Sequence, residues 1–294
     1  MITRTTSSMM NQAALRNLQA NYGNLAKLQN QASSQKVLTA SSDDPVAASK
    51  ILSVHAEQAR NDQYARNVTD GLAWVTTVDT ALSAATALLN RARDLTLQGA
   101  NSGAMGAESR EAIATELDSI RAELLGQANS KVMGRSVFAG TSDQAAFNPA
   151  DYSYSGTPGS QVNRRISEGE AVRVDADGAA VFGVGADSVF ALLDKISADL
   201  RAGVNVGHYV ADIDVRISGV LGAQGTIGAR QAQIERAQSA AAGAAVDLET
   251  QRTRLEDVDA IDVLVRLQSA QLVYQTALQV TAKAQQTTLM EFIR

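Results

Sequence analysis

The sequence predicts a mainly α-helical protein with a small β-rich insertion, in which the N- and C-terminal regions form a long coiled-coil-like helical bundle. Apolar residues recur at helical spacing in the first and last thirds of the chain, whereas glycine, proline and short alternating segments gather between them. Hydrophobic residues make up 45% of the 294 residues and aromatic residues only 4%. That balance suits long helices packed through small side chains.

Residues 1–42 are predicted to form a terminal helix. Residues at steps of three and four lie on one face of a helix. In this segment the apolar residues with that spacing are Leu15, Leu18, Tyr22 and Leu25.

Residues 43–134 are predicted to form the N-terminal half of a helical rod. Asp43 and Asp44 are expected to cap its first helix, because a carboxylate accepts hydrogen bonds from free backbone N–H groups and Pro45 suits the first helical position. The three–four rhythm then continues through Val68, Leu72, Val75, Val78, Leu82, Ala85, Leu89 and Ala92. After a break at 101–106, a further helix presents Ile113, Leu117, Ile120 and Leu124.

Residues 135–185 are predicted to form the β-rich insertion, since they contain many glycines and two of the three prolines. Val172 and Val174 alternate with Arg173 and Asp175, as the residues of a half-buried strand do. The insertion therefore separates two helical tracts.

Residues 186–257 are predicted to form the C-terminal half of the rod, and residues 258–294 a second terminal helix. A seven-residue repeat keeps one seam facing a partner helix, which indicates coiled-coil-like packing. Four glycines between Gly219 and Gly228 weaken the early part, because each costs about 1 kcal/mol relative to alanine. The repeat consists of Ile213, Val220, Ile227, Ile234, Ala241, Leu248 and Leu255.

Both ends of the chain are poor in charge. Residues 1–42 contain no acidic residue, and no further acid lies between Asp262 and Glu291. A solvated helix normally carries many charges on its outward face, so these helices are expected to be surrounded by protein. Either they pack with copies of themselves in an assembly, or they form an antiparallel pair inside a monomeric bundle. The predicted assembly surface consists of Leu15, Leu18, Tyr22, Leu25, Leu264, Leu272, Tyr274, Leu278, Leu289 and Phe292.

Composition excludes several classes of function. The net charge is −5 and the basic residues are scattered, so we expect no nucleic-acid partner. There is no cysteine, which excludes disulfides and thiolate sites. The sequence shows neither a run of about 18 apolar residues nor a cleaved signal, so we expect no membrane insertion. This pattern is typical of a cytoplasmic protein or of one exported without a cleaved signal.

Motifs for catalysis or ligand binding are also missing. His55 and His208 lie far apart in sequence, and the Asp-Ala-Asp-Gly run at 175–178 lacks the remaining ligands of a calcium loop. We therefore predict no catalytic residue, no cofactor and no metal site, and the protein is not expected to be an enzyme. An enzyme site in the insertion would need a titratable cluster that this segment lacks.

The amino-acid sequences of both ends resemble those of the bacterial flagellin superfamily. The N-terminal resemblance comprises 1–28, 31–36 (Gln-Ala-Ser-Ser-Gln-Lys), 42–48 (Ser-Asp-Asp-Pro-Val-Ala-Ala), 67–71, 82–89 and 91–95. The C-terminal resemblance comprises 271–278 (Gln-Leu-Val-Tyr-Gln-Thr-Ala-Leu) and 289–294 (Leu-Met-Glu-Phe-Ile-Arg). The resemblance extends over both ends, about half of the chain, and these segments occur in the order of the family. One departure is Gln35, which stands where the family commonly has glycine, so the turn there is expected to differ.

Within the superfamily, two details resemble the hook–filament junction proteins. Pro45 follows the paired aspartates where flagellins usually carry a small residue. The segments 138–140 (Phe-Ala-Gly) and 147–149 (Phe-Asn-Pro) resemble the entry to the β domain of the junction proteins. Flagellin itself, the bulk filament subunit, is the alternative within the family. A cytoplasmic helical signalling bundle is a more remote alternative.

The resemblance implies a secreted structural subunit of the flagellum, exported without a cleaved signal peptide. It implies a homo-oligomer in a helical assembly, with a neighbouring hook-associated protein and flagellin as partners. It also implies an export chaperone that binds the C-terminal helix. On this basis 1–42 is an assembly and export helix and 258–294 an assembly helix.

Overall fold

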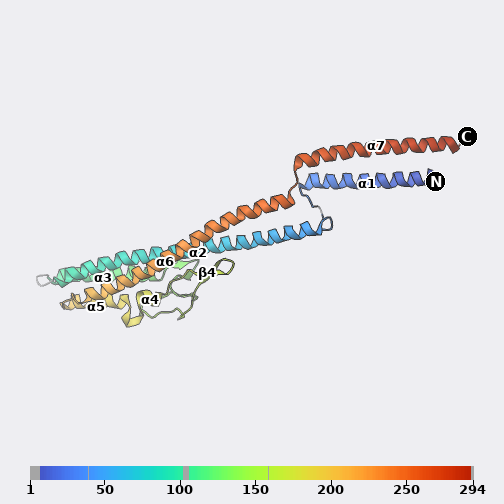
Figure 1. Ribbon diagram of the computed structural model, residues 1–294. Coiled ribbons are helices and arrows are strands. Elements are labelled where there is room, and N and C mark those ends of the chain that lie inside the picture. Colours follow the sequence, from blue (N-terminus) through green and yellow to red (C-terminus); the bar gives the residue numbers. More distant parts are fainter. Residues whose placement is uncertain (1–6, 39, 102–105, 158, 293–294) are drawn as a thin grey trace. The chain divides into compact units, whose positions relative to one another are not determined.

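The computed structural model of the protein describes residues 7–38, 40–101, 106–157 and 159–292. It confirms the predicted fold class, because long helices dominate and two small antiparallel sheets occur between α3 and α4 in the sequence (Figure 1). The long helices are α1 (Ser7–Ser34), α2 (Pro45–Ala100), α3 (Ala107–Ala128), α5 (Val189–Ala202), α6 (Tyr209–Glu256) and α7 (Ala260–Phe292). Short turns of helix occur at α4 (Gly178–Phe182) and η2 (Gly185–Asp187).

The chain divides into two compact units. Unit 1 consists of residues 1–60 and 245–294, and thus contains both ends of the chain. Unit 2 consists of residues 61–244 and contains the insertion.

The core of unit 2 is formed by the predicted apolar faces. Ile213, Val220, Ile227 and Ile234 of α6 are all buried, as the seven-residue repeat predicts. The predicted faces of α2 and α3 are buried in the same core except for Leu72, which is half-buried against it, and Trp74 also belongs to the core. Polar bonds also join α2 to α6, such as the ion pair of 2.6 Å between Arg93 and Asp214.

The glycine-containing part of α6 is helical from Tyr209 onward. Buried Val220 and Ile227 lie within this part, so core packing outweighs the low helix propensity of the glycines. Gly222 and Gly228 are exposed, and they are not required by a close contact with another element.

The insertion contains two short hairpins and much irregular backbone. Strand β1 (Lys131–Val132) pairs with β2 (Arg135–Ser136), and β3 (Asn163–Ser167) pairs with β4 (Glu170–Arg173). An aromatic cluster joins the irregular part of the insertion to α4 and α5. It consists of Phe138, Phe147, Tyr152, Tyr154, Phe182 and Phe190.

The strand prediction for the insertion needs one correction. Val172 and Val174 are buried as expected, but Asp175 is buried as well instead of facing solvent. Its carboxylate accepts two hydrogen bonds from Arg173, at 2.9 and 2.8 Å, and one from the backbone N–H of Val162 at 2.8 Å. These hydrogen bonds offset the free-energy cost of burying the Asp175 carboxylate. The strand can therefore be followed by a charged residue inside the core.

The apolar character of α2 bears on the expectation of no membrane insertion. By length and composition alone, α2 is apolar enough to cross a bilayer. Its Val75, Val78 and Leu82 are fully buried in the core of unit 2, so its apolar character is accounted for by packing.

Candidate assembly surface

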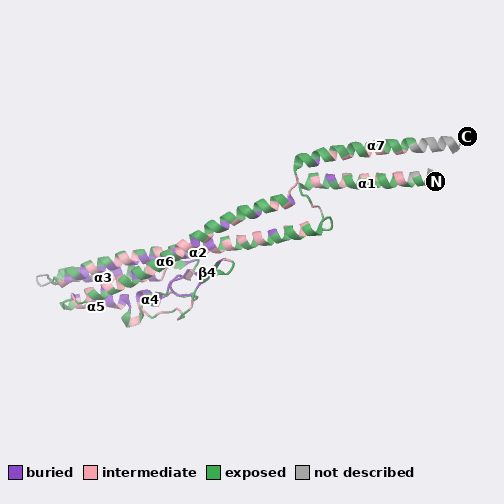
Figure 2. Cartoon of the chain, viewed as in Figure 1, coloured by how far each residue is buried: buried purple, intermediate pink, exposed green. Residues whose placement is uncertain are grey.

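Helices α1 and α7 lie side by side and run in opposite directions, which brings the first and last helices of the chain together (Figure 1). The rings of Tyr22 and Tyr274 lie 5.9 Å apart between their centroids. Leu28 of α1 and Val263 of α7 are buried. The contact is narrow, because exposed residues predominate along the described part of both helices (Figure 2).

Large apolar side chains remain exposed on both helices. Leu15 is 50% exposed, Leu272 is 65% exposed and Ile261 is 77% exposed. Burying a leucine or isoleucine stabilises an assembly by about 1.5–3 kcal/mol relative to leaving it in water. A surface with several such side chains is typical of a protein–protein interface.

The predicted surface residues fall into three groups. Leu15, Tyr22, Leu264, Leu272 and Leu278 are exposed, whereas Leu18, Leu25 and Tyr274 are half-buried in the pair. Leu289 and Phe292 lie in the part of α7 whose side chains fall outside the described residues. The structure brings Tyr22 and Tyr274 together within one chain. That all of these residues contact neighbouring subunits remains a prediction.

The prediction omitted further exposed apolar residues. Val265, Val273 and Val280 of α7 and Met9 of α1 are each at least half exposed. The sequence does indicate them, because apolar residues occupy more than one face of α7. The resulting apolar surface is wider than a single partner helix can cover. The candidate surface is therefore broader than one stripe on each helix.

Charges on the pair are sparse, as the sequence indicates. The acid at the start of α7, Asp262, pairs with Arg266 one turn later at 2.8 Å. Such an exposed pair contributes little to stability. The outward faces between these few charges thus resemble an interface more than a solvated surface.

The start of α2 has a capping geometry. Asp44 Oδ1 accepts hydrogen bonds from the backbone N–H groups of Val46 and Ala47, both at 3.0 Å. Pro45 is the first residue of the helix. The backbone N–H of Asp43 donates to the carbonyl oxygen of Ala40 at 3.0 Å. These aspartates therefore lie in a turn and cap, and the geometry gives them a structural role.

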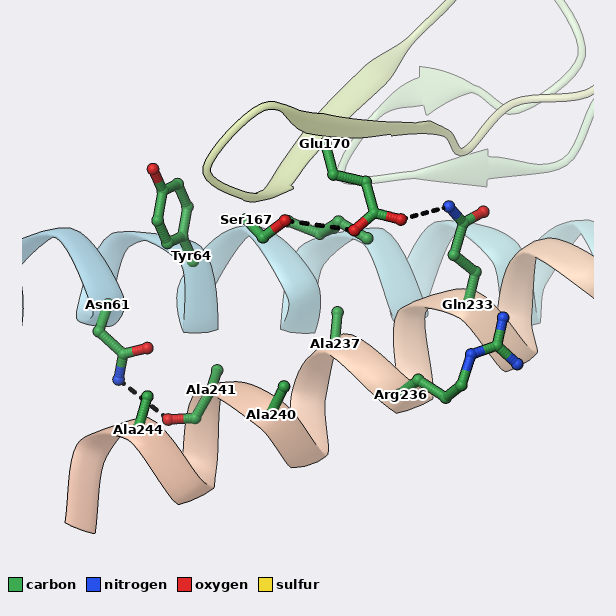
Figure 3. Close-up of a pocket in the computed structure, with 11 residues that line it drawn as sticks. Asn61, Tyr64, Ser167, Glu170, Gln233, Arg236, Ala237, Ala240, Ala241 and Ala244 are labelled. Carbon is green, nitrogen blue, oxygen red and sulfur yellow. Dashed lines mark hydrogen bonds between the residues drawn. The ribbon is translucent and has the colours of Figure 1, made fainter. Parts of the chain in front are cut away.

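Unit 2 has a groove of about 440 Å³ between the β3–β4 hairpin and helices α2 and α6 (Figure 3). Its α6 side is formed by Gln233, Arg236 and four alanines: Ala237, Ala240, Ala241 and Ala244. Glu170 accepts hydrogen bonds from Ser167 at 3.2 Å and from Gln233 at 2.7 Å. These polar groups bond to one another, unlike the converging free groups that orient a small ligand.

Metal-binding geometry is not found within the described residues, where no three or more histidine, aspartate or glutamate side chains are grouped to hold an ion. His55 Nε2 donates to the Glu256 carboxylate at 3.3 Å, and the rings of His208 and Tyr209 are tilted against each other with centroids 3.9 Å apart. Both histidines therefore have neighbours that explain their positions.

Comparisons with known proteins agree with this arrangement of terminal helices. Residues 6–143 match the model of the bacterial flagellin N-terminal helical region, and residues 210–293 match that of the C-terminal helical region. The chain is 29% identical to flagellar hook-associated protein 3 of Salmonella typhimurium over 95% of both chains. It is 28% identical to flagellar hook-associated protein 3 of Escherichia coli over 68% of this chain and 59% of that protein.

Solved structures share the fold. A putative flagellar hook-associated protein from Vibrio parahaemolyticus superposes with a TM-score of 0.66 and 24% identity, covering 73% of this chain and 100% of the other. FlgL of Bacillus cereus superposes with a TM-score of 0.60 and 22% identity, covering 68% of this chain and 99% of the other.

Proposed function

The chain belongs to the bacterial flagellin superfamily, and from this premise we propose that it is the adapter at the hook–filament junction on which flagellin polymerises. The similarity to flagellar hook-associated protein 3 over 95% of both chains is the observation that carries the proposal. It favours the junction over the bulk filament, because the second relative is also a hook-associated protein 3. The role is structural and not enzymatic.

The exposed apolar faces of α1 and α7 support the assembly part of the proposal. Copies of this chain would cover them in a helical array, with a neighbouring hook-associated protein on one side and flagellin on the other. A repeated head-to-tail contact needs different surfaces on each copy, and the width of the apolar region on α7 allows several contacts. Charged substitutions on this surface are therefore expected to abolish assembly while the subunit still folds.

The same surface supports two proposals about the route to the flagellum. Exposed apolar helices promote aggregation, so α7 is expected to be held by an export chaperone before secretion. Export would use the flagellar route without a cleaved signal peptide, with the N-terminal segment as the address. A pull-down of the chaperone that is lost on removal of 260–294 would test the first of these.

Deletion of the gene tests the proposed function. Electron microscopy of the cells and a protein gel of the medium are expected to show bare hooks and flagellin released into the medium. Bare hooks without released flagellin would instead indicate the filament subunit. Normal filaments and normal motility would contradict the proposal.

A further inference from the structure

Two breaks between helices face each other in unit 1. The N-linker, residues 35–44, joins α1 to α2, and the C-linker, residues 257–259, joins α6 to α7. The backbone N–H of Val37 donates to the carbonyl oxygen of Glu256 at 2.8 Å, and that of Val258 donates to Gln35 at 3.1 Å. The two linkers are thus paired like a very short antiparallel ladder.

The Glu256 carboxylate lies beside this ladder and is almost completely buried, with a side-chain exposure of 8%. Lys36 Nζ of the N-linker lies 2.6 Å from Oε1. His55 Nε2 of α2 lies 3.3 Å from Oε2, and a terminal nitrogen of Arg252 on α6 lies 3.1 Å from Oε2. Three separate segments of the chain therefore converge on one carboxylate.

Glu256 is the central residue of this cluster, because the other side chains all bond to its carboxylate. A buried carboxylate is costly unless it is paired, and here it is paired with groups from both sides of the ladder. Arg252 is held independently, because it also bonds to Glu249 at 2.8 Å and to Asp257 at 3.1 Å. Lys36 pairs with Glu256, so this ion pair joins the N-linker to the last residue of α6, beside the backbone hydrogen bonds of the ladder.

The backbone of the N-linker favours the same conclusion. Gln35 has a φ of 56°, in the left-handed region that non-glycine residues disfavour. The Gln35 N–H donates to the carbonyl oxygen of Gln31 at 2.9 Å, and Gln31 Nε2 donates to that of Val37 at 2.8 Å, but each such hydrogen bond contributes only about 1 kcal/mol in water. The ion pair supplies an additional restraint next to the strained residue.

We propose that Glu256 is the latch of an ionic clasp that closes the N-linker onto the C-linker, so that the two breaks act as a single joint. In the closed state Lys36 bonds to the Glu256 carboxylate. The Val37 N–H donates to the carbonyl oxygen of Glu256 and is thereby protected from hydrogen exchange. In the open state both linkers are exposed together. The clasp belongs to the isolated subunit, and its test does not depend on the function proposed above.

Hydrogen exchange measured by mass spectrometry on the full-length protein at pH 7 tests the clasp. Glu256→Gln is expected to raise the exchange rate of the Val37 and Val258 amides at least tenfold, while residues 210–240 keep their protection. The Val37 amide is a specific probe, because Val37 lies far in sequence from the substituted Glu256. Its hydrogen bond goes to the backbone oxygen of residue 256, which the substitution leaves in place. Unchanged protection of Val37 would overturn the proposal.

Two further variants separate the clasp from a general loss of structure. Glu249→Gln removes an exposed carboxylate that also binds Arg252 but not Lys36, and it is expected to leave Val37 protected. Equal loss of protection in this control would contradict the clasp. Lys36→Met keeps the Glu256 carboxylate and is expected to deprotect both Val37 and Val258. If Glu256→Gln also deprotects residues 210–240, the Lys36→Met result decides, and protection of Val258 in that variant would refute the clasp.

Discussion

Replacing Gly222 by alanine is expected to stabilise the protein by about 1 kcal/mol. Gly222 lies in the interior of α6, and a Cβ added there would meet no atom within 4 Å. Glycine loses more backbone conformational entropy on folding than alanine does. No close packing contact at Gly222 offsets this loss. Gly228 has the same open surroundings, so Gly228→Ala should add a similar gain.

Gly99 provides the matched control within a helix. A Cβ at this position in α2 would lie 2.6 Å from Cδ2 of Leu200, which is fully buried. Overpacking of this kind costs about 1–3 kcal/mol, which offsets or exceeds the gain in helix propensity. Gly99→Ala is therefore expected to leave the protein no more stable than the wild type, or to destabilise it.

Urea unfolding followed by far-UV circular dichroism and by the fluorescence of Trp74 measures both changes. Trp74 is the single tryptophan of the chain, is buried, and lies in the same unit as all three glycines. The midpoint should rise for Gly222→Ala with an unchanged slope, and should not rise for Gly99→Ala. A midpoint for Gly222→Ala at or below that of the wild type would refute the reasoning.

Three further predictions concern named side chains. Ile234→Ala, at a fully buried position of the repeat, should cost about 2–5 kcal/mol in urea unfolding, whereas Val215→Ala on the exposed face of the same helix should cost less than about 0.5 kcal/mol. Gln35→Gly should stabilise the protein by about 1 kcal/mol in thermal unfolding, because it relieves the left-handed φ of 56°, and a destabilised variant would contradict this. The hydrogen bond from Lys36, with those from Arg252 and His55, lowers the pKa of Glu256 from 4.5 to about 2. A depressed folded-state pKa stabilises the protein above pH about 4.5, so the stability difference between the wild type and Glu256→Gln should shrink as the pH falls toward 2, and a constant difference would count against it.

The helical part of the fold could be predicted from the sequence because each face is a local, periodic signal. The positions from Ile213 to Ile234 repeat every seven residues, and the structure buries them. The glycines do not interrupt α6, because burial of Val220 and Ile227 outweighs a helix-propensity cost of about 1 kcal/mol per glycine.

The interior of the insertion could not be predicted in the same way. The low aromatic content of the whole chain conceals a local concentration, because the insertion and α5 hold the six clustered rings. Asp175 reads as an outward residue by alternation, and its burial depends on Arg173 and Val162, whose bonds no spacing rule specifies. The Glu256 cluster joins residues more than 200 positions apart, which a reading of one sequence does not reveal.

The scarcity of charge on α1 and α7 indicates helices that need neighbours, and the structure leaves Leu15 and Leu272 exposed. That neighbouring subunits cover these residues stays a prediction. Which exposed residues a neighbour covers depends on the symmetry of the assembly, which the isolated chain does not encode in its own contacts.

The central claim is that the apolar faces of the terminal helices serve assembly at the junction and not folding of the subunit. Leu272→Lys tests it most directly, with Leu272→Met as a control that keeps the side chain apolar. Cells that carry Leu272→Lys are expected to have bare hooks and to release flagellin, while the purified variant keeps the helicity and the Trp74 fluorescence of the wild type. Normal filaments with Leu272→Lys, or loss of the folded subunit, would contradict the claim.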